Sequence, residues 1–168
     1  METKTTILVV DDERRVEKMF MRKFHKHPEF AWHFAFDGKE AIEALHAHPD
    51  TKIIFTDLNM PNMDGMALLK HLAKTYFDGH VVVISAYGDY ERRREAMQHG
   101  AFDILGKPII WQDLEATIGR ALKMQAQISK LEAQNRQLSD RVQELKRKLM
   151  FAYVRIQELE SRNPENSP

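Results

Sequence analysis

The last third of the sequence contains no helix-breaking residue over more than forty positions, and this feature limits its fold most. The last glycine is Gly119, and no proline occurs between Pro108 and Pro164. Glycine and proline are the residues that destabilise helix interiors most. The segment is rich in Gln, Leu, Lys, Glu and Arg instead. It therefore predicts one long helix from Gln112 to about Arg162, roughly 75 Å long at 1.5 Å per residue.

Apolar residues repeat along this predicted helix at alternating spacings of four and three. One set of positions is Ile128, Asn135, Val142, Leu149 and Ile156, and the other is Leu131, Leu138, Leu145, Ala152 and Leu159. These are the a and d positions of a coiled coil, and one helix cannot bury such a stripe alone. β-branched residues at a, Leu at d and a single Asn at a favour two parallel strands. We therefore predict a parallel homodimer through these residues.

Two alternatives to the homodimer stay open. A different chain could supply the second helix, because the flanking charges of a parallel homodimer are mixed. Arg155 would attract Glu160 of the second copy, whereas Arg141 would repel Lys146, each by tenths of a kcal/mol. The helix could also fold back on the rest of the chain as a surface helix. An unbroken pattern of five heptads disfavours this second alternative.

The first 110 residues alternate short apolar runs with amphipathic stretches. The runs are Ile7–Val10, Trp32–Phe36, Ile53–Thr56, Val81–Ile84 and Phe102–Leu105. Continuous Val- and Ile-rich strands that alternate with helices indicate a parallel sheet covered on both faces. We predict a doubly wound α/β fold with a five-stranded parallel sheet. The expected boundaries are a domain at residues 1–123, a continuous coiled-coil helix at 124–162 and a flexible tail at 163–168.

Polar residues follow the predicted strands at matching places. Asp11 and Asp12 follow the first strand, Asp57 the third and Lys107 the fifth, and Ser85 ends the fourth. Ligands of parallel sheets bind at the carboxyl edge, where the strand order reverses. If the first and third strands are neighbours, three carboxylates meet there and repel one another unless a cation lies among them. Oxygen ligands in an incomplete protein cage fit Mg²⁺ best.

Four segments together resemble a known family. They are Ile7–Glu13 (ILVVDDE), Thr56–Gly65 (TDLNMPNMDG), Val83–Asp89 (VISAYGD) and Gly100–Pro108 (GAFDILGKP). In combination they resemble the receiver domain of two-component response regulators, over residues 5 to about 123. The resemblance implies a flavodoxin-like fold and a signalling phosphoacceptor. Such a protein is not an enzyme beyond its self-catalysed phosphotransfer and slow autodephosphorylation.

The resemblance also implies a role for each acidic residue. Asp57 would be the nucleophile that takes a phosphoryl group from a sensor histidine kinase or a histidine phosphotransfer protein. Asp12 and Asp57 would bind Mg²⁺ directly, and Asp11 would assist through water. The main-chain carbonyl of Asn59 would be a further ligand. Such a site performs phosphoryl transfer mainly by positioning and charge stabilisation.

Further positions follow from the resemblance. Lys107 would neutralise charge on the phosphoryl oxygens, and Ser85 would hydrogen-bond the attached group. Asn59 and Tyr87 occupy positions that tune the access of hydrolytic water.

One position departs from the family. Receivers usually carry Tyr or Phe three residues before the lysine, and this chain has Ile104. The switch would then repack an aliphatic side chain. Strand alternation places Phe102 on the same face as Ile104, where it could substitute for the missing ring. A degenerate receiver that takes no phosphate is the alternative, and the five intact chemical positions disfavour it.

Composition excludes several classes of protein. Cysteine is absent, which rules out disulfides, thiolate metal sites and thiol nucleophiles. Lys and Arg together number 25, and so do Asp and Glu. The chain therefore has no net positive charge that would favour binding to nucleic acid. In basic-zipper proteins, a segment dense in Arg and Lys precedes the coiled coil and binds DNA. Here the segment before the predicted coiled coil, residues 113–127, has only two basic residues, Arg120 and Lys123. No apolar run is long enough for a membrane span and no signal peptide begins the chain, so we expect a cytoplasmic protein.

The sequence thus predicts a response regulator whose phosphorylated domain acts on a dimeric coiled coil. One alternative is the N-terminal part of a longer regulator, whose helix would be a stalk to an output domain. Another is a coiled-coil scaffold with a regulatory or inert receiver head. A third is a shuttle that passes the phosphoryl group to a histidine phosphotransfer protein.

Overall fold

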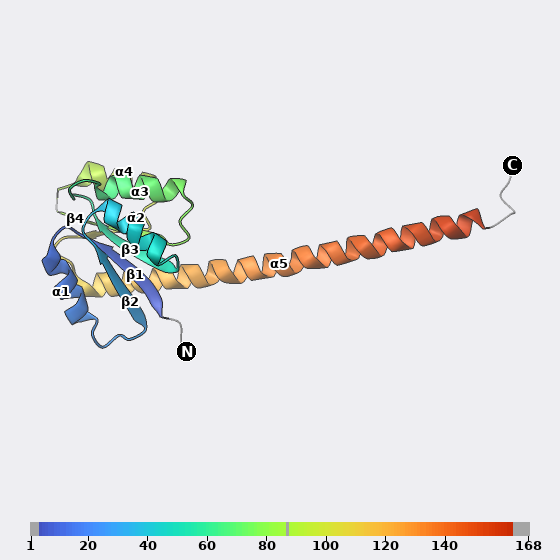
Figure 1. Cartoon of the computed structure of the whole chain (residues 1–168), viewed down its shortest axis with the longest axis horizontal. Helices are drawn as coiled ribbons and strands as arrows, with labels where there is room; N and C mark the ends of the chain where they lie inside the picture. The colour runs from blue at the N-terminus through green and yellow to red at the C-terminus, as the bar shows by residue number, and fades with distance from the viewer. Residues whose placement is uncertain (1–3, 87, 163–168) are drawn as a thin grey trace. The chain divides into compact units, whose positions relative to one another are not determined.

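The computed structural model describes residues 4–86 and 88–162, which form a five-stranded parallel sheet, the helices around it and a long last helix. Strands and helices alternate along the chain (Figure 1). The strands are β1 (Thr5–Val10), β2 (Phe30–Ala35), β3 (Thr51–Asp57), β4 (His80–Ser85) and β5 (Asp103–Gly106). The helices are α1 (Arg14–Lys23), α2 (Gly38–Ala47), α3 (Gly65–Lys74), α4 (Tyr90–Gln98) and α5 (Trp111–Ser161). The predicted doubly wound α/β fold is confirmed.

The strand order in the sheet is β2-β1-β3-β4-β5, and every neighbouring pair is parallel. The order reverses between β1 and β3, so the carboxyl ends of these strands diverge to helices on opposite faces. Val10 pairs with Thr56 in the register of these two strands. The residues that follow, Asp11 and Asp57, therefore meet at one edge of the sheet.

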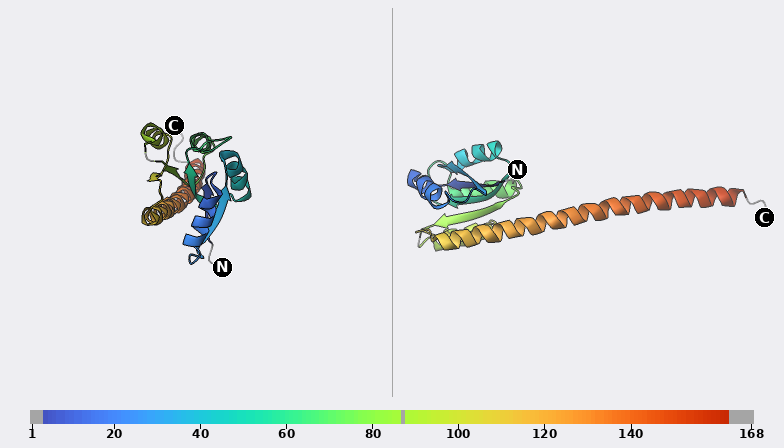
Figure 2. Two further views of the ribbon diagram at one scale, coloured as in Figure 1. Left: turned by 90° about the vertical axis from the view of Figure 1, so that its left-hand side faces the viewer. Right: turned by 90° about the horizontal axis from the view of Figure 1, so that it is seen from below.

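Each face of the sheet carries its own apolar core. On one face, alternate residues such as Leu8, Val10 and Ile54 pack with residues of α2, α3 and α4. On the other, Val9, Phe55 and their neighbours pack with α1 and the first turns of α5. Figure 2 shows the helices on both sides of the sheet. Two buried faces explain why the strands read as continuous apolar runs rather than as alternating ones.

Helix starts follow local sequence signals. The carboxylate of Asp37 accepts hydrogen bonds from the main-chain N–H groups of Lys39 and Glu40, at 2.8 and 2.9 Å, and so caps α2. The carboxylate of Asp64 accepts from the N–H of Ala67 at 2.8 Å and caps α3. Such caps satisfy N–H groups that have no partner inside the helix. An Asp directly before an amphipathic stretch is a helix start that the sequence itself indicates, and Asp37 is such a residue.

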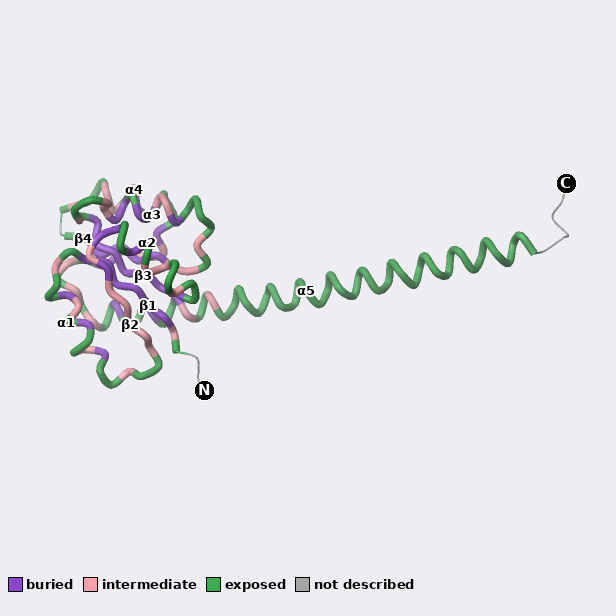
Figure 3. The backbone as a smooth tube through the Cα atoms, viewed as in Figure 1, coloured by how far each residue is buried: buried purple, intermediate pink, exposed green. Residues whose placement is uncertain are grey.

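Helix α5 belongs to two compact units, residues 1–124 and 125–168. Its first turns bury Leu114, Thr117, Ile118 and Ala121 in the first unit. From residue 126 to residue 162 every residue is exposed in the single chain (Figure 3). The large apolar residues of the predicted heptads are all exposed, from 37% at Ile128 to 72% at Leu149. Along the described part of the chain, no helix is long and apolar enough to cross a membrane.

Candidate functional site at the carboxyl edge of the sheet

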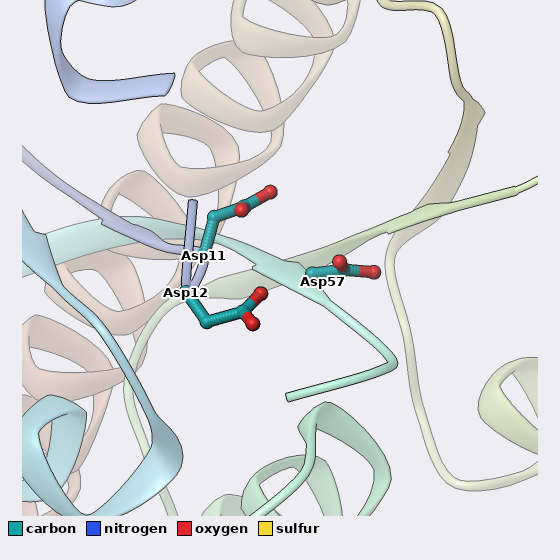
Figure 4. A group of neighbouring side chains, drawn as sticks. All are labelled: Asp11, Asp12 and Asp57. Carbon is teal, nitrogen blue, oxygen red and sulfur yellow. The ribbon is translucent and has the colours of Figure 1, made fainter. Parts of the chain in front are cut away.

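Three carboxylates meet where β1 and β3 end. Asp11 and Asp12 follow β1 and Asp57 is the last residue of β3, as Figure 4 shows. One oxygen from each of the three lies within 4.8 Å of the others. Asp11 and Asp57 are buried and Asp12 is exposed. This convergence was expected if β1 and β3 are neighbours, and the sheet order confirms that they are.

Lys107 supplies the positive charge of this edge. Its Nζ donates to Asp57 Oδ2 at 2.7 Å and to Asp11 Oδ2 at 3.0 Å. Burial lowers the pKa of Lys107, but its hydrogen bonds to Asp57 and Asp11 and their charges outweigh burial, so the pKa lies above its ordinary value. The ammonium group is therefore fully charged at neutral pH. It holds the two buried carboxylates together from the end of β5.

Burial penalises the charged form of the Asp11 carboxylate. Burial raises its pKa above the ordinary value, and the charge of Asp57 raises it further. The N–H of Glu13, which donates to Asp11 Oδ1 at 2.9 Å, and the ammonium of Lys107 offset part of this increase. A buried carboxylate in this condition gains from additional positive charge nearby. Three converging carboxylates form the donor set that hard cations such as Mg²⁺ prefer.

Ser85 completes the edge from the end of β4. It is fully buried, and its Oγ is one of the few buried side-chain polar atoms in the described chain without a hydrogen-bond partner. Asp57 and Ile84 are paired in the register of β3 and β4, which places Ser85 one residue beyond the partner of Asp57. Leaving a buried hydroxyl unpaired costs free energy. A ligand oxygen at this edge would supply the missing partner.

The loop between β3 and α3 packs closely against the end of β3. The N–H of Gly65 donates to the carbonyl of Leu58 at 3.2 Å. A Cβ atom on Gly65 would lie 1.9 Å from the carbonyl oxygen of Asp57, which is far inside van der Waals contact. Only glycine fits there without displacing the main chain of Asp57. The sequence showed this glycine as part of a turn but gave no signal that it faces Asp57.

Arg92 of α4 reaches across to the same loop. Its guanidinium donates to Asp64 Oδ2 at 2.7 Å, to the carbonyl of Leu58 at 3.3 Å and to Oδ1 of Asn59. The Nδ2 of Asn59 in turn donates to Asp89 Oδ2 at 3.2 Å. The loop that follows Asp57 is therefore tied to α4 by several hydrogen bonds. Sequence reasoning missed Arg92, because it is one of three consecutive arginines and only the fold distinguishes them.

The structure changes one expectation about β5. Ile104 packs with the core on the face of α2, α3 and α4, whereas Phe102 packs with the opposite core. The prediction that the two share a face is wrong, because Phe102 precedes the first residue of β5 and alternation does not extend to it. The Phe102 ring contacts the His80 ring in a tilted arrangement, with 4.4 Å between the ring centroids. Tyr87 lies outside the described residues.

Comparison with known proteins shows the family to which the chain belongs. Residues 7–119 match the response regulator receiver domain family. The chain belongs to the response regulator receiver domain family. The receiver domain is 35% identical to regulatory protein AtoC of Escherichia coli over 121 residues, which is 71% of this chain and 26% of AtoC. It is 30% identical to transcriptional regulatory protein HptR of Staphylococcus aureus over 122 residues, 70% of this chain and 46% of HptR.

Solved receiver structures match the same region. The receiver domain of the Francisella response regulator 1452 superimposes with a TM-score of 0.64 and 30% identity, over 72% of this chain and 98% of that one. NtrX of Brucella abortus superimposes with a TM-score of 0.70 and 27% identity, over 77% of this chain and 30% of NtrX. This chain thus spans less than half the length of the curated relatives AtoC and HptR. The match to the family model ends at residue 119, in the first turns of α5.

Proposed function

We propose that Asp57 accepts a phosphoryl group in a Mg²⁺-dependent reaction, and that the modified receiver domain acts on a dimeric coiled coil. The donor would be a phosphohistidine on a sensor histidine kinase or a histidine phosphotransfer protein. One observation carries this proposal. A buried carboxylate, two neighbouring carboxylates, a paired lysine and an unpaired buried hydroxyl converge at one edge of the sheet. That set offers a nucleophile, cation ligands and two groups for phosphoryl oxygens.

In the reaction, a carboxylate oxygen of Asp57 attacks the phosphorus of the phosphohistidine. The new P–O bond forms as the P–N bond breaks, and the histidine nitrogen leaves with the electron pair. The N–H of Asn59, at 3.3 Å from Oδ1, and the ammonium of Lys107 fix the orientation of the Asp57 carboxylate. Lys107 then neutralises charge on the transferred oxygens. Such fixed charges supply most of the catalysis in phosphoryl transfer.

Asp11, Asp12, Asp57 and the main-chain carbonyl of Asn59 are the groups we assign to Mg²⁺. The ion would neutralise charge on the phosphoryl oxygens when bound. Arg92 and Asp89 hold the side chain of Asn59, and thereby help to fix the position of its main chain. Asn59 and Tyr87 would set how readily water reaches the acyl phosphate.

The switch would begin at Ser85, whose unpaired Oγ would hydrogen-bond the attached phosphoryl group. Movement of Ser85 would leave room for Ile104 to repack on the α4 face of β5, in place of the usual aromatic ring. Arg92 gives α4 a direct connection to the loop after Asp57. The equilibrium between two conformations of the receiver domain would shift by the difference in affinity of each for the phosphoryl group.

The output would be a parallel homodimer through residues 124–162, continuous with the receiver domain at 1–123; the tail predicted at 163–168 lies outside the described residues. The exposed apolar residues of α5 support this: Ile128, Leu131, Leu138, Val142, Leu145, Leu149, Ile156 and Leu159. Asn135, also exposed, would fix the register. We expect no nucleic-acid or membrane partner for this segment and a cytoplasmic location.

A second candidate is the N-terminal part of a longer regulator. AtoC and HptR extend well beyond the matched segment, and HptR is a transcriptional regulatory protein. In that case the same helix would be a stalk that transmits the receiver state to an output domain. A third possibility is a scaffold whose receiver domain is inert, and its partner binding would not change when Asp57 is substituted. Binding partners of the coiled coil that are retained by Asp57→Ala would favour the scaffold.

The test combines chemistry and assembly. Incubation of the chain with Mg²⁺ and acetyl phosphate should add one phosphoryl group, seen by intact mass, that hydroxylamine removes. Asp57→Asn should abolish the addition, whereas Asp64→Asn on the same loop should retain it. Sedimentation equilibrium with and without beryllofluoride, an acyl-phosphate mimic, then measures the output. An unmodified wild-type chain would overturn the phosphoacceptor, and a monomer under both conditions would overturn the coiled coil.

A further inference from the structure

One short segment of α5, residues 149–154, is apolar on nearly every side of the helix. From residue 129 to residue 148, Ala133 is the only apolar residue outside the a and d positions. The pattern then changes, and four large apolar residues occupy other positions. These are Met150, Phe151, Tyr153 and Val154, with exposed fractions of 64%, 77%, 59% and 47%. A helix that is apolar all round is normally buried against more than one neighbour.

The a and d positions of the predicted coiled coil, which we call the seam, do not account for these residues. Continuing the heptads places Met150 at b, Phe151 at c, Tyr153 at e and Val154 at f. Positions b, c and f lie on the side of a helix that faces away from its coiled-coil partner. The d position of this heptad is Ala152, the smallest residue of the seam. Apolar volume is therefore concentrated on the outside of the predicted dimer at this point.

The outward side carries a self-complementary pattern. Arg147, Phe151, Val154 and Glu158 follow one another at spacings of four, three and four residues, and we call them the outer stripe. Residues so spaced lie along one line of a helix, here over roughly 16 Å. Two copies of the outer stripe placed antiparallel bring Phe151 opposite Val154 and Arg147 opposite Glu158, at both ends. A parallel arrangement would place like charges opposite each other.

The charges at the two ends of the outer stripe are free to form such pairs. Among the described residues Arg147 makes no ion pair. Glu158 pairs only with Arg155 on its own helix, at 3.5 Å and with both side chains exposed. Exposed pairs of this kind contribute little, about 0–1 kcal/mol, and can exchange for a pair between chains.

We propose that the outer stripe binds a second copy of itself, antiparallel and centred between Ala152 and Tyr153, so that dimers of the chain associate through the C-terminal end of α5. The contact is isologous, because the same residues face each other on both chains. It is small, so association should be weak, with dissociation near 100 µM as an order of magnitude. A parallel dimer presents the outer stripe twice, on opposite sides, and association would therefore continue beyond four chains as concentration rises.

The experiment measures the mass of the full chain by sedimentation equilibrium from about 5 µM to about 1 mM. We expect a dimer in dilute solution and a mass that rises beyond the dimer at high concentration. Phe151→Gln with Val154→Gln should hold the mass at the dimer. Arg147→Glu alone and Glu158→Arg alone should do the same, because each places like charges together. The two reversals combined should restore association, since the swapped pair is again complementary.

Controls separate this contact from the seam and from general charge effects. Arg147 and Glu158 are eleven residues apart on one helix, so no intrahelical pair explains a rescue. Arg136→Glu, an outward charge reversal outside the outer stripe, should leave association unchanged. A chain that goes from monomer to dimer would contradict the seam but support the outer stripe. A wild-type mass fixed at the dimer, or failure of the double reversal to restore association, would overturn the proposal.

Discussion

The receiver domain and the exposed part of α5 differ in the burial of their apolar residues. Every buried apolar side chain in the described chain lies at or before Ala121. Beyond it, the large apolar residues of the heptads are at least 37% exposed. The first region completes its core with its own strands and helices, whereas the second leaves its heptad residues exposed in the single chain. In the proposed dimer, the stability of the second region would depend on protein concentration, and that of the receiver domain would not.

The two regions also differ in what they do with charge. In the receiver domain, Lys107 is held between Asp57 and Asp11, both buried. In α5, Glu144 forms exposed pairs with Arg141 and Lys148 on its own helix. Electrostatic interactions are strong where water is excluded and weak where it is not. The buried charges of the first region therefore suit the proposed phosphoryl transfer, whereas the exposed charges of the second would contribute only weakly to the proposed dimer.

The largest expected effect comes from charge placed in the seam. Val142→Lys with Leu145→Lys should halve the mass in dilute solution, from about twice to about once the 19.7 kDa of the chain. Amides of residues 126–161 should lose protection from hydrogen exchange, because an isolated helix is marginal in water. Protection in β1 and β3 should not change. Gln143→Lys, on the outer side, is the control, and loss of protection in the sheet would show that the two regions fold as one unit.

A second prediction concerns glycine in each region. Gly65→Ala should destabilise the receiver domain by about 3 kcal/mol, because the added Cβ would press on the carbonyl of Asp57. Gly119→Ala should instead stabilise α5 by about 1 kcal/mol, since nothing lies within 4 Å of its Cβ and alanine favours a helix. Denaturant unfolding of both variants measures the difference. Equal effects would contradict the close approach at Gly65.

A third prediction tests the connection between α4 and the loop after Asp57. Arg92→Ala should weaken Mg²⁺ binding by about tenfold, because the variant frees Asn59 and the loop that carries its carbonyl. Arg94→Ala, which removes an exposed arginine of the same helix, should bind Mg²⁺ like the wild type. Arg92→Lys should fall between them, since lysine cannot make all three contacts. Calorimetric titration with Mg²⁺ provides the affinities, and identical values for the two alanine variants would refute the connection.

The smallest effect concerns pH. Hydrogen bonds to Asp37, first from the N–H of Glu40 and then from Asn62, hold the pKa of this carboxyl below its ordinary value of 3.8. A lowered pKa means that the ionised form stabilises the fold above pH 3.8 and that this stability is lost as pH falls through the folded pKa. Asp37→Asn should therefore be about 0.5–1 kcal/mol less stable at pH 7, and the deficit should shrink in acid.

Denaturant unfolding from about pH 7 down to about pH 3 measures this deficit. Asp140→Asn in the exposed part of α5 is the matched control, and its stability should stay within about 0.5 kcal/mol of the wild type. A deficit that does not depend on pH would assign the effect to lost hydrogen-bond geometry rather than to the charge.

Several features could be predicted from the sequence alone, because they depend on neighbouring residues. Continuous apolar runs indicated the parallel strands, Asp37 indicated the start of α2, and the absence of glycine and proline indicated α5. These conclusions rest on local propensity and periodicity, which each short segment carries by itself. The convergence of Asp11, Asp12 and Asp57 needed the further assumption that β1 and β3 are neighbours, which the sheet order confirms.

Other features were decided by the tertiary structure. Gly65 faces Asp57, Arg92 rather than Arg94 reaches the loop, and Phe102 packs on the face opposite Ile104. Each of these features depends on contacts between residues that are distant in sequence. A local sequence pattern does not predict such contacts. The seam of α5 is the reverse case, because its pattern is plain in the sequence while the single chain leaves it exposed. Secondary structure depends mainly on the local sequence, whereas contacts between distant residues form only when the chain folds.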